Sequence, residues 1–301
     1  MKQSERAGLL YVLAGFSMLS VGDAVIKGMA GLWPPAAMAA TRYTLAAIGL
    51  AAILAAREGP AAIWRMPKPG LQWIRGLAVS IATIAIFTAV WLMPLAEATT
   101  ITFTQPMLTA LLAALVLGER LRRPAIVATL VAFVGVVIVL RPNLAAIGLA
   151  ALLPLLNAGA MAMLMIANRA SAGAGSVLAM QTYISMTAAA LLITATVAGH
   201  FSGAPELEMH WPHWSVLARC AFIAVSATLA HWLIYMGTAR AGAATVAPMT
   251  YGQLLSAVAL GWIFFGDVPD ALSLLGAAII IGAGLFLWWM GGRQRAVPPA
   301  R

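Results

Sequence analysis

The chain has 301 residues, of which 62% are hydrophobic and 9% are charged, whereas a water-soluble domain usually carries about 25% charged residues. So little polar surface excludes a soluble globular domain. The formal net charge of +9 does not indicate nucleic-acid binding, because the sequence has no phosphate-binding loop, zinc-ligand spacing or arginine–aromatic platform. The apolar residues form continuous runs rather than the alternation of a membrane β-barrel, so we predict an all-α integral membrane protein.

Ten apolar runs follow one another along the chain, most of them near the length of about 20 residues that crosses a bilayer. Breaks rich in Pro and Gly, such as 31–35 and 141–143, separate the runs. We therefore predict ten transmembrane helices. Their expected ranges are 7–27, 36–56, 73–93, 98–117, 125–140, 147–167, 177–198, 214–236, 243–265 and 272–291.

One stretch of the chain occurs twice, first at 94–106 and again at 242–254. Without gaps, the alignment pairs Phe103 with Tyr251 and Gln105 with Gln253. Because each half holds five spans, an odd number, the second half enters the membrane from the opposite side. We predict two inverted five-helix repeats around a central cavity. The expected units are 1–142, 143–292 and a disordered cytoplasmic tail at 293–301.

Lys and Arg gather in the loops on one side of this predicted topology, the side that also holds both chain ends. Loops rich in Lys and Arg face the cytoplasm in membrane proteins. The pattern predicts a multi-pass protein of the bacterial cytoplasmic (inner) membrane with cytoplasmic N- and C-termini.

The sequence resembles the EamA-type branch of the drug/metabolite transporter superfamily. The resemblance is carried by residues 94–98, Pro106, 117–120 and 135–137 in the first half and by 265–269 and 276–280 in the second. It implies ten helices around a central cavity and movement of small organic metabolites, often outward. Members of this kind include YddG-type amino-acid exporters and carriers of nucleotide-like compounds.

Three ionisable residues lie within or beside the first two predicted spans, where charge is costly and often functional: Asp23, Lys27 and Arg42. Asp23 and Lys27 are four residues apart on one helix and are expected to pair. These groups either form a charged vestibule, with Lys27 and Arg42 facing the substrate, or a salt bridge that fixes two helices. Glu97 and Asp23 are the candidates for proton coupling, because a buried carboxylate can load and release a proton near neutral pH.

Polar and aromatic side chains in the spans supply candidates for substrate contact. Gln105 and Gln253 are expected to face each other across the pseudo-symmetry axis, since they occupy matching positions of the repeat. The alternative is that polar groups join helices and that aromatic rings face lipid or the membrane interface. The candidate substrate-binding residues are Gln105, Gln253, Tyr251, Thr102, Asn157, Trp91, Phe87, His231 and Tyr235.

These observations predict a secondary transporter that exports small organic metabolites by alternating access, with amino acids, aromatic or of broad range, as the expected substrates. The alternatives are an uptake or exchange carrier for a larger nucleoside-like metabolite and a multidrug-type exporter. An enzyme would show clustered carboxylates or histidines within the spans, and none occur. We expect no catalytic site, metal or cofactor. The expected partners are a small-molecule substrate, the lipid bilayer and a coupling proton, in a monomer or weak homodimer.

Overall fold

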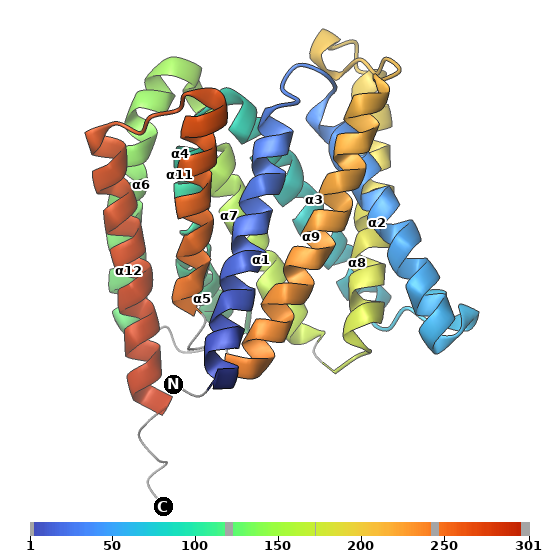
Figure 1. Cartoon of the computed structure of the whole chain (residues 1–301), viewed down its shortest axis with the longest axis horizontal. Coiled ribbons are helices and arrows are strands. Elements are labelled where there is room, and N and C mark those ends of the chain that lie inside the picture. The colour runs from blue at the N-terminus through green and yellow to red at the C-terminus, as the bar shows by residue number, and fades with distance from the viewer. Residues whose placement is uncertain (1–2, 118–122, 172, 242–246, 296–301) are drawn as a thin grey trace, which may run out of the picture.

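The computed structural model describes residues 3–117, 123–171, 173–241 and 247–295, and within them every regular element is a helix (Figure 1). Residues 118–120, part of the segment 117–120 that carries the family resemblance, lie outside the described residues. The last helix continues to Arg295, so residues 293–295 of the predicted tail are helical, and the remainder of that tail lies outside the described residues. The α-helices are α1 (Gln3–Lys27), α2 (Pro35–Glu58), α3 (Pro69–Leu92), α4 (Leu95–Thr102), α5 (Gln105–Leu117), α6 (Arg123–Ile147), α7 (Leu153–Ala170), α8 (Val177–His200), α9 (Trp214–Ala241), α11 (Gly252–Phe265) and α12 (Ala271–Arg295). The short 3₁₀ helices are η1 (Pro60–Ile63), η2 (Gly148–Leu152), η3 (Pro205–Leu207) and η4 (Ala247–Tyr251).

Eight helical stretches among the described residues are long and apolar enough to cross a membrane, and two shorter apolar helices, Ile126–Arg141 and Met249–Phe265, accompany them. One stretch, Leu95–Val116, takes in α4 and most of α5. The ten apolar segments correspond in order to the ten predicted spans. The protein is an all-α multi-pass membrane protein of about ten helices.

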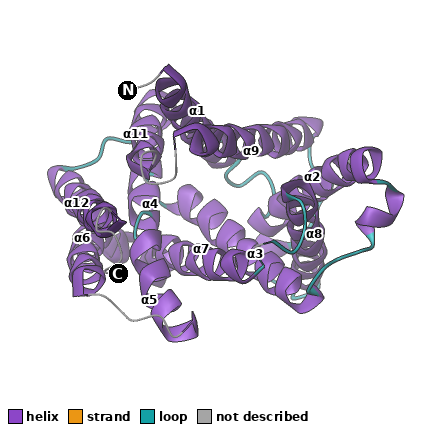
Figure 2. Ribbon diagram, turned by 90° about the horizontal axis from the view of Figure 1, so that it is seen from below, coloured by secondary structure: helices purple, strands orange, loops and turns teal. Residues whose placement is uncertain are grey.

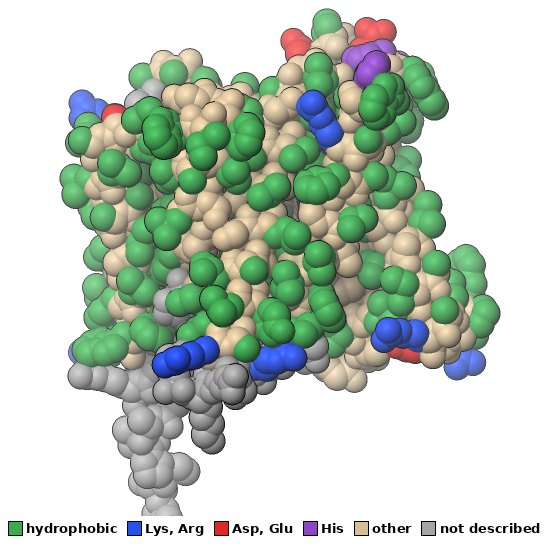
Figure 3. All heavy atoms as spheres, viewed as in Figure 1, with side chains coloured by type: hydrophobic (Ala, Val, Ile, Leu, Met, Phe, Trp, Pro, Cys, Tyr) green, Lys and Arg blue, Asp and Glu red, His purple; other side chains and the backbone are tan. Residues whose placement is uncertain are grey.

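The basic residues gather at one end of the bundle. We call the end where α1 begins and α12 ends the terminal end and the opposite end the distal end (Figure 1). In the space-filling view, most of the visible Lys and Arg side chains lie along the edge of the terminal end and a few lie at the distal end, whereas most of the visible Asp, Glu and His side chains lie at the distal end (Figure 3). This is the asymmetry that the loops of the sequence predicted.

The helices pack in pairs that join the two halves of the chain. The most extensive pairings are α1 with α9, α3 with α7, α2 with α8 and α6 with α12. Seen along the bundle, α6 and α12 stand on one side and α2 and α8 on the other (Figure 2). Exchanging the first five spans with the last five converts α1–α9 into α7–α3 and leaves the other two pairs unchanged. The packing thus has the pairing expected of an inverted repeat.

The first copy of the repeated stretch interrupts a membrane helix, and the described part of the second copy contains a change from 3₁₀ to α-helix. In the first copy, α4 ends at Thr102 and α5 begins at Gln105, because Pro106 lacks an N–H and its ring displaces the carbonyl four residues earlier. In the second copy, η4 gives way to α11 at Gly252, although Leu254 occupies the position equivalent to Pro106. Interrupted helices of this kind often flank the binding sites of transporters.

The predicted break at 141–143 is wrong. α6 runs through Pro142 to Ile147, and the chain turns instead at Gly148, whose φ of +61° is a left-handed conformation suited to glycine. A proline inside a helix costs about 3 kcal/mol. Asn143, one residue later, is buried and donates to Glu97 of α4, a contact that holds this part of α6 in place.

The start of α12 is capped by Asp270, whose Oδ1 accepts a hydrogen bond of 2.6 Å from the backbone N–H of Ser273. This bond holds the pKa of the Asp270 carboxyl below its usual value. A lowered carboxyl pKa stabilises the fold above the pKa of the unfolded chain, and the contribution disappears as the pH falls through the folded value.

We expect Asp270→Ala to lower the melting temperature slightly at pH 7, because the cap is lost, and to differ less from wild type near pH 3. Asp270→Asn keeps a side-chain oxygen and serves as the control. Thermal unfolding of the purified protein in detergent at both pH values checks this. If the melting temperature of Asp270→Ala lies below that of wild type by the same amount at both pH values, the charge of Asp270 contributes nothing to stability.

Candidate functional site

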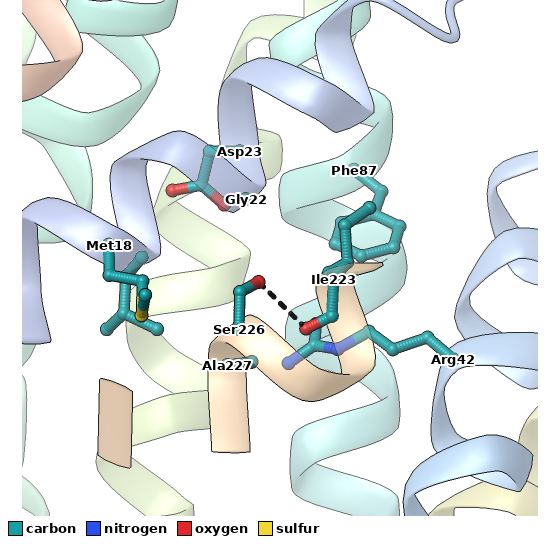
Figure 4. Close-up of a pocket in the computed structure, with 9 residues that line it drawn as sticks. Met18, Gly22, Asp23, Arg42, Phe87, Ile223, Ser226 and Ala227 are labelled. Carbon is teal, nitrogen blue, oxygen red and sulfur yellow. Dashed lines mark hydrogen bonds between the residues drawn. The ribbon is translucent and has the colours of Figure 1, made fainter. Parts of the chain in front are cut away.

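A small cavity lies between α1, α2, α3 and α9 (Figure 4). Its volume is about 30 Å³, which is room for about one or two water molecules. Asp23 from α1 and Arg42 from α2 reach into it, together with Phe87 from α3 and Ser226 from α9. The remaining lining is formed by small or apolar residues: Met18, Leu19, Gly22, Ile223 and Ala227.

The cavity contains two opposite charges that are not in direct contact. Among the described residues, the ion pair within 4.0 Å is Lys27 with Asp267, so Asp23 and Arg42 are farther apart than that. Both side chains are half-buried within membrane-spanning helices. The result is a carboxylate and a guanidinium with space between them.

Neutral neighbours hold both charged side chains in place. Gln253, at the start of α11, donates from Nε2 to Asp23 Oδ2 at 3.4 Å. The backbone carbonyl of Gln253 accepts a hydrogen bond of 2.6 Å from Ser20, one turn before Asp23 on α1. The Arg42 guanidinium lies over the Tyr43 ring at 4.9 Å and the Phe87 ring at 5.8 Å, both distances of cation–π contacts. Elements α1, α2, α3 and α11 therefore determine the positions of the two charges.

The expected pair of Asp23 with Lys27 does not form. Lys27 instead forms an ion pair of 2.5 Å with Asp267 and donates to the carbonyl of Met93 at 3.0 Å. Asp267 also accepts from the backbone N–H of Leu95 at 3.2 Å. Asp267 follows Gly266, whose φ of +69° ends α11 in a left-handed turn and brings the acid toward α1. We call Lys27, Asp267, Met93 and Leu95 the distal clamp, because they join α1, α3, α4 and α11 at the distal end.

Glu97 also lies away from the cavity. Its side chain is buried, accepts a 2.8 Å hydrogen bond from Ser273 of α12 and accepts a further hydrogen bond from Asn143 of α6. Polar neutral donors therefore satisfy this carboxylate. Of the two coupling candidates, Asp23 faces the cavity and Glu97 joins three helices.

Several predicted contact residues join helices. Trp91 donates from its indole nitrogen to the carbonyl of Ile26 at 2.8 Å, linking α3 to α1. The buried Asn157 donates to the carbonyl of Ala82 at 2.8 Å, linking α7 to α3. Thr102 donates to Thr99 of its own helix at 2.6 Å. Of the predicted aromatic residues, Phe87 is the one that lines the cavity.

Two further aromatic candidates, His231 and Tyr235, lie on α9. His231 is exposed, and its Nδ1 lies 2.6 Å from the carbonyl of Ala227, a residue that lines the cavity. The side chain of Tyr235 lies outside the described residues. Among the described residues, no group of three or more His, Cys, Asp or Glu side chains is placed to hold a metal ion.

The pseudo-symmetric contact between the repeat copies is made two residues earlier than expected. Phe103 and Tyr251, which occupy matching positions, meet edge to face with 5.2 Å between ring centroids. The Tyr251 hydroxyl also donates to the carbonyl of Ile281 at 3.3 Å. Gln105 is half-buried at the start of α5, whereas Gln253 reaches Asp23. The two glutamines therefore have different surroundings.

Sequence reasoning missed two polar features. Ser20 and Ser226 support or line the cavity, and a small hydroxyl residue in an apolar helix gives little signal because it often bonds its own backbone. Arg75 is buried in α3, near the terminal end, where it donates to Asn168 at 2.7 Å, to Gln72 at 2.5 Å and to the carbonyl of Met180 at 3.2 Å. It joins α3, α7 and α8 instead of lying in a loop.

Comparison with known proteins gives the following similarities. Residues 6–141 match the EamA-like transporter family. The chain is 29% identical over 222 residues to the S-adenosylmethionine uptake transporter of Rickettsia bellii, covering 73% of this chain and 72% of that protein. It is 27% identical over 281 residues to the pseudopaline exporter CntI of Pseudomonas aeruginosa, covering 93% and 94%. It is 30% identical over 215 residues to the riboflavin transporter of Rhizobium johnstonii, covering 71% and 64%. One crystal structure matches 98% of this chain and all of its own chain, with a TM-score of 0.59 at 20% identity, a likeness of fold.

Proposed function

Because residues 6–141 match the EamA-like transporter family and similar proteins are named as transporters, we propose that this chain exports small organic metabolites, with amino acids as the substrates, by alternating access across the bacterial cytoplasmic membrane. The observation that carries the choice of substrate is the pair of unpaired opposite charges, Asp23 and Arg42, in a cavity at membrane depth. Ionisable groups in such a position commonly mark a substrate pathway. The aromatic wall at Phe87 favours apolar or ring-bearing substrates.

The distal clamp supplies the closed end that alternating access requires. It joins α1 and the α3–α4 turn, from the first half, to the end of α11, from the second. The two repeats, 1–142 and 143–292, move relative to each other when the clamp opens. With the termini in the cytoplasm, as the loop charges predict, opening of the cavity away from the distal clamp would expose it to the cytoplasm, where an exporter loads its substrate.

Asp23 is the group through which a proton gradient acts. Arg42 of α2 is the charged group that faces it, while α3, α9 and α11 present Phe87, Ser226 and Gln253. Substrate and proton then compete for one carboxylate, which is a simple means of coupling their movements. Glu97 is fully bonded to neutral partners and does not take part.

The test is flux of labelled L-phenylalanine and L-methionine in proteoliposomes, with and without a pH gradient. We expect saturable flux that the gradient changes, loss of the gradient effect in Asp23→Asn, and its retention in Glu97→Gln. If no amino acid moves in vesicles that hold folded protein, amino-acid transport is excluded. A gradient effect that survives in Asp23→Asn would remove this residue from coupling.

The second candidate is uptake of a larger metabolite, which the names of two similar proteins, a riboflavin transporter and an S-adenosylmethionine uptake transporter, favour. Riboflavin and S-adenosylmethionine therefore belong in the same flux panel. Saturable entry of either compound without amino-acid flux would decide for uptake. The protein works as a monomer or weak homodimer in either case.

A further inference from the structure

We propose that the cavity recognises the zwitterionic head of an α-amino acid, with Asp23 binding the ammonium group and Arg42 the carboxylate. The inference rests on the proposed transport function and defines its substrate class by chemistry. Any metabolite that carries a free α-amino acid head belongs to the class, and compounds that lack either charge do not.

The electrostatics of Asp23 and Arg42 favour a ligand that carries both charges. A carboxylate and a guanidinium within membrane-spanning helices lose hydration, and a direct ion pair would compensate each of them. Asp23 and Arg42 are more than 4.0 Å apart, although the same protein makes an ion pair of 2.5 Å between Lys27 and Asp267. A ligand that brings an ammonium to Asp23 and a carboxylate to Arg42 neutralises both groups at once.

Neighbouring side chains hold Asp23 and Arg42 in position before a ligand binds. Asp23 is held by Gln253, which Ser20 fixes in turn through a 2.6 Å hydrogen bond. Arg42 is held against the Tyr43 and Phe87 rings, and the Tyr43 hydroxyl lies 3.3 Å from Thr83 Oγ1. Charges held in position before binding lose little entropy when the ligand arrives. Both groups enter the cavity from different helices, as Figure 4 shows.

The cavity does not select the part of a substrate that lies beyond its head group. Its space of about 30 Å³ accommodates an ammonium or a water molecule, so the remainder of a substrate extends beyond it when the helices separate. The nearby side chains of Met18, Leu19 and Ile223 are apolar and offer no strong hydrogen bonds to a particular substrate side chain. The site is therefore selective for the head group of the substrate and tolerant of different side chains.

The test is equilibrium binding to the purified full-length protein in detergent. The probes are L-phenylalanine and L-methionine, each compared with its amide, which lacks the carboxylate, and its deaminated acid, which lacks the ammonium. We expect each amino acid to bind at least about tenfold more tightly than either analogue, as expected for a lost charged hydrogen bond.

Two variants assign the charges. Arg42→Gln is expected to weaken amino-acid binding by about tenfold while leaving the amide unchanged, so that the preference for the carboxylate disappears. Asp23→Asn is expected to remove the preference for the ammonium in the same manner. Arg57→Gln, an exposed arginine at the other end of α2, and Glu206→Gln, an exposed acid in η3, are the matched controls.

Equal weakening of all three ligand types by either variant would overturn the proposal, because the charges would then be structural. Absence of binding by both amino acids would overturn it as well. The transport function itself is judged separately by the flux panel. Saturable riboflavin flux that is unchanged in Arg42→Gln leaves a transporter without this recognition, whereas no flux of any probe removes the transport function too.

Discussion

Replacing Lys27 by methionine is expected to destabilise the protein by about 3 kcal/mol and to open its distal end, because Asp267 is left without its cation. The pair is largely buried, with the two side chains 13% and 17% exposed. Lys27 also donates to the carbonyl of Met93, so the α3–α4 turn loses its attachment to α1. Unfolding in mixed micelles of SDS and mild detergent measures the change in stability.

Opening of the distal end can be measured separately, through the reactivity of a buried cysteine. Cys220, the one cysteine of the chain, is fully buried on α9, which packs against α1. We expect Lys27→Met to accelerate its reaction with N-ethylmaleimide and to alter the maximal rate of transport. Arg57→Met is the control for removing a cation. The double variant Lys27→Met with Asp267→Leu should recover more than half of the lost stability, since an apolar pair of similar volume often replaces a buried ion pair.

Two results would contradict a role of the distal clamp in opening the protein. An unchanged reaction rate of Cys220 in a destabilised Lys27→Met protein would make the clamp a purely structural contact. A double variant as unstable as the single one would show that the Lys27–Asp267 charges matter less than the neighbouring backbone bonds.

Replacing Gly276 by alanine is the second large effect that we expect, a loss of about 1–3 kcal/mol from overpacking. A Cβ at this position would lie 2.6 Å from Val139 Cγ2 and 2.7 Å from the carbonyl of Gly135. Gly135 in turn has Gly276 O at 2.8 Å from its own hypothetical Cβ. The two backbones therefore touch where α6 crosses α12, and any side chain forces the helices apart.

The same helix supplies the matched control. A Cβ at Gly282 meets nothing within 4 Å, so Gly282→Ala should be neutral or stabilising by about 0.5–1 kcal/mol, the usual advantage of Ala over Gly in a helix. Thermal unfolding of both variants in one detergent makes the comparison. If Gly276→Ala is as stable as Gly282→Ala, the close approach of α6 and α12 does not contribute to stability.

The sequence predicted the helices well because their signals are local. Apolar runs, prolines and glycines located all ten segments, and Pro106 marked the interruption between α4 and α5. The break at 141–143 was wrong because Asn143 is held by Glu97, a residue 46 positions away whose influence no local pattern contains.

The candidate site was predicted in part. Asp23 and Arg42 were recognised as ionisable residues in apolar spans and Phe87 as an aromatic candidate, and the structure brings these three to one cavity. The expected partner of Lys27 was wrong because spacing along one helix suggested Asp23, whereas the actual partner, Asp267, is 240 residues away. Among the other candidates, Glu97, Trp91 and Asn157 join helices, a role that the sequence left open beside a functional one.

By itself, the sequence determined that this is an all-α membrane protein with about ten helices, a repeated stretch and basic residues at one end. Composition, hydropathy and charge suffice for this, because the bilayer acts on each segment separately. Only the tertiary structure decided which charges meet: Lys27 with Asp267 in the distal clamp, and Asp23 opposite Arg42 without contact. Such pairings depend on the rotation and depth of helices far apart in the chain, which packing sets and no local pattern encodes.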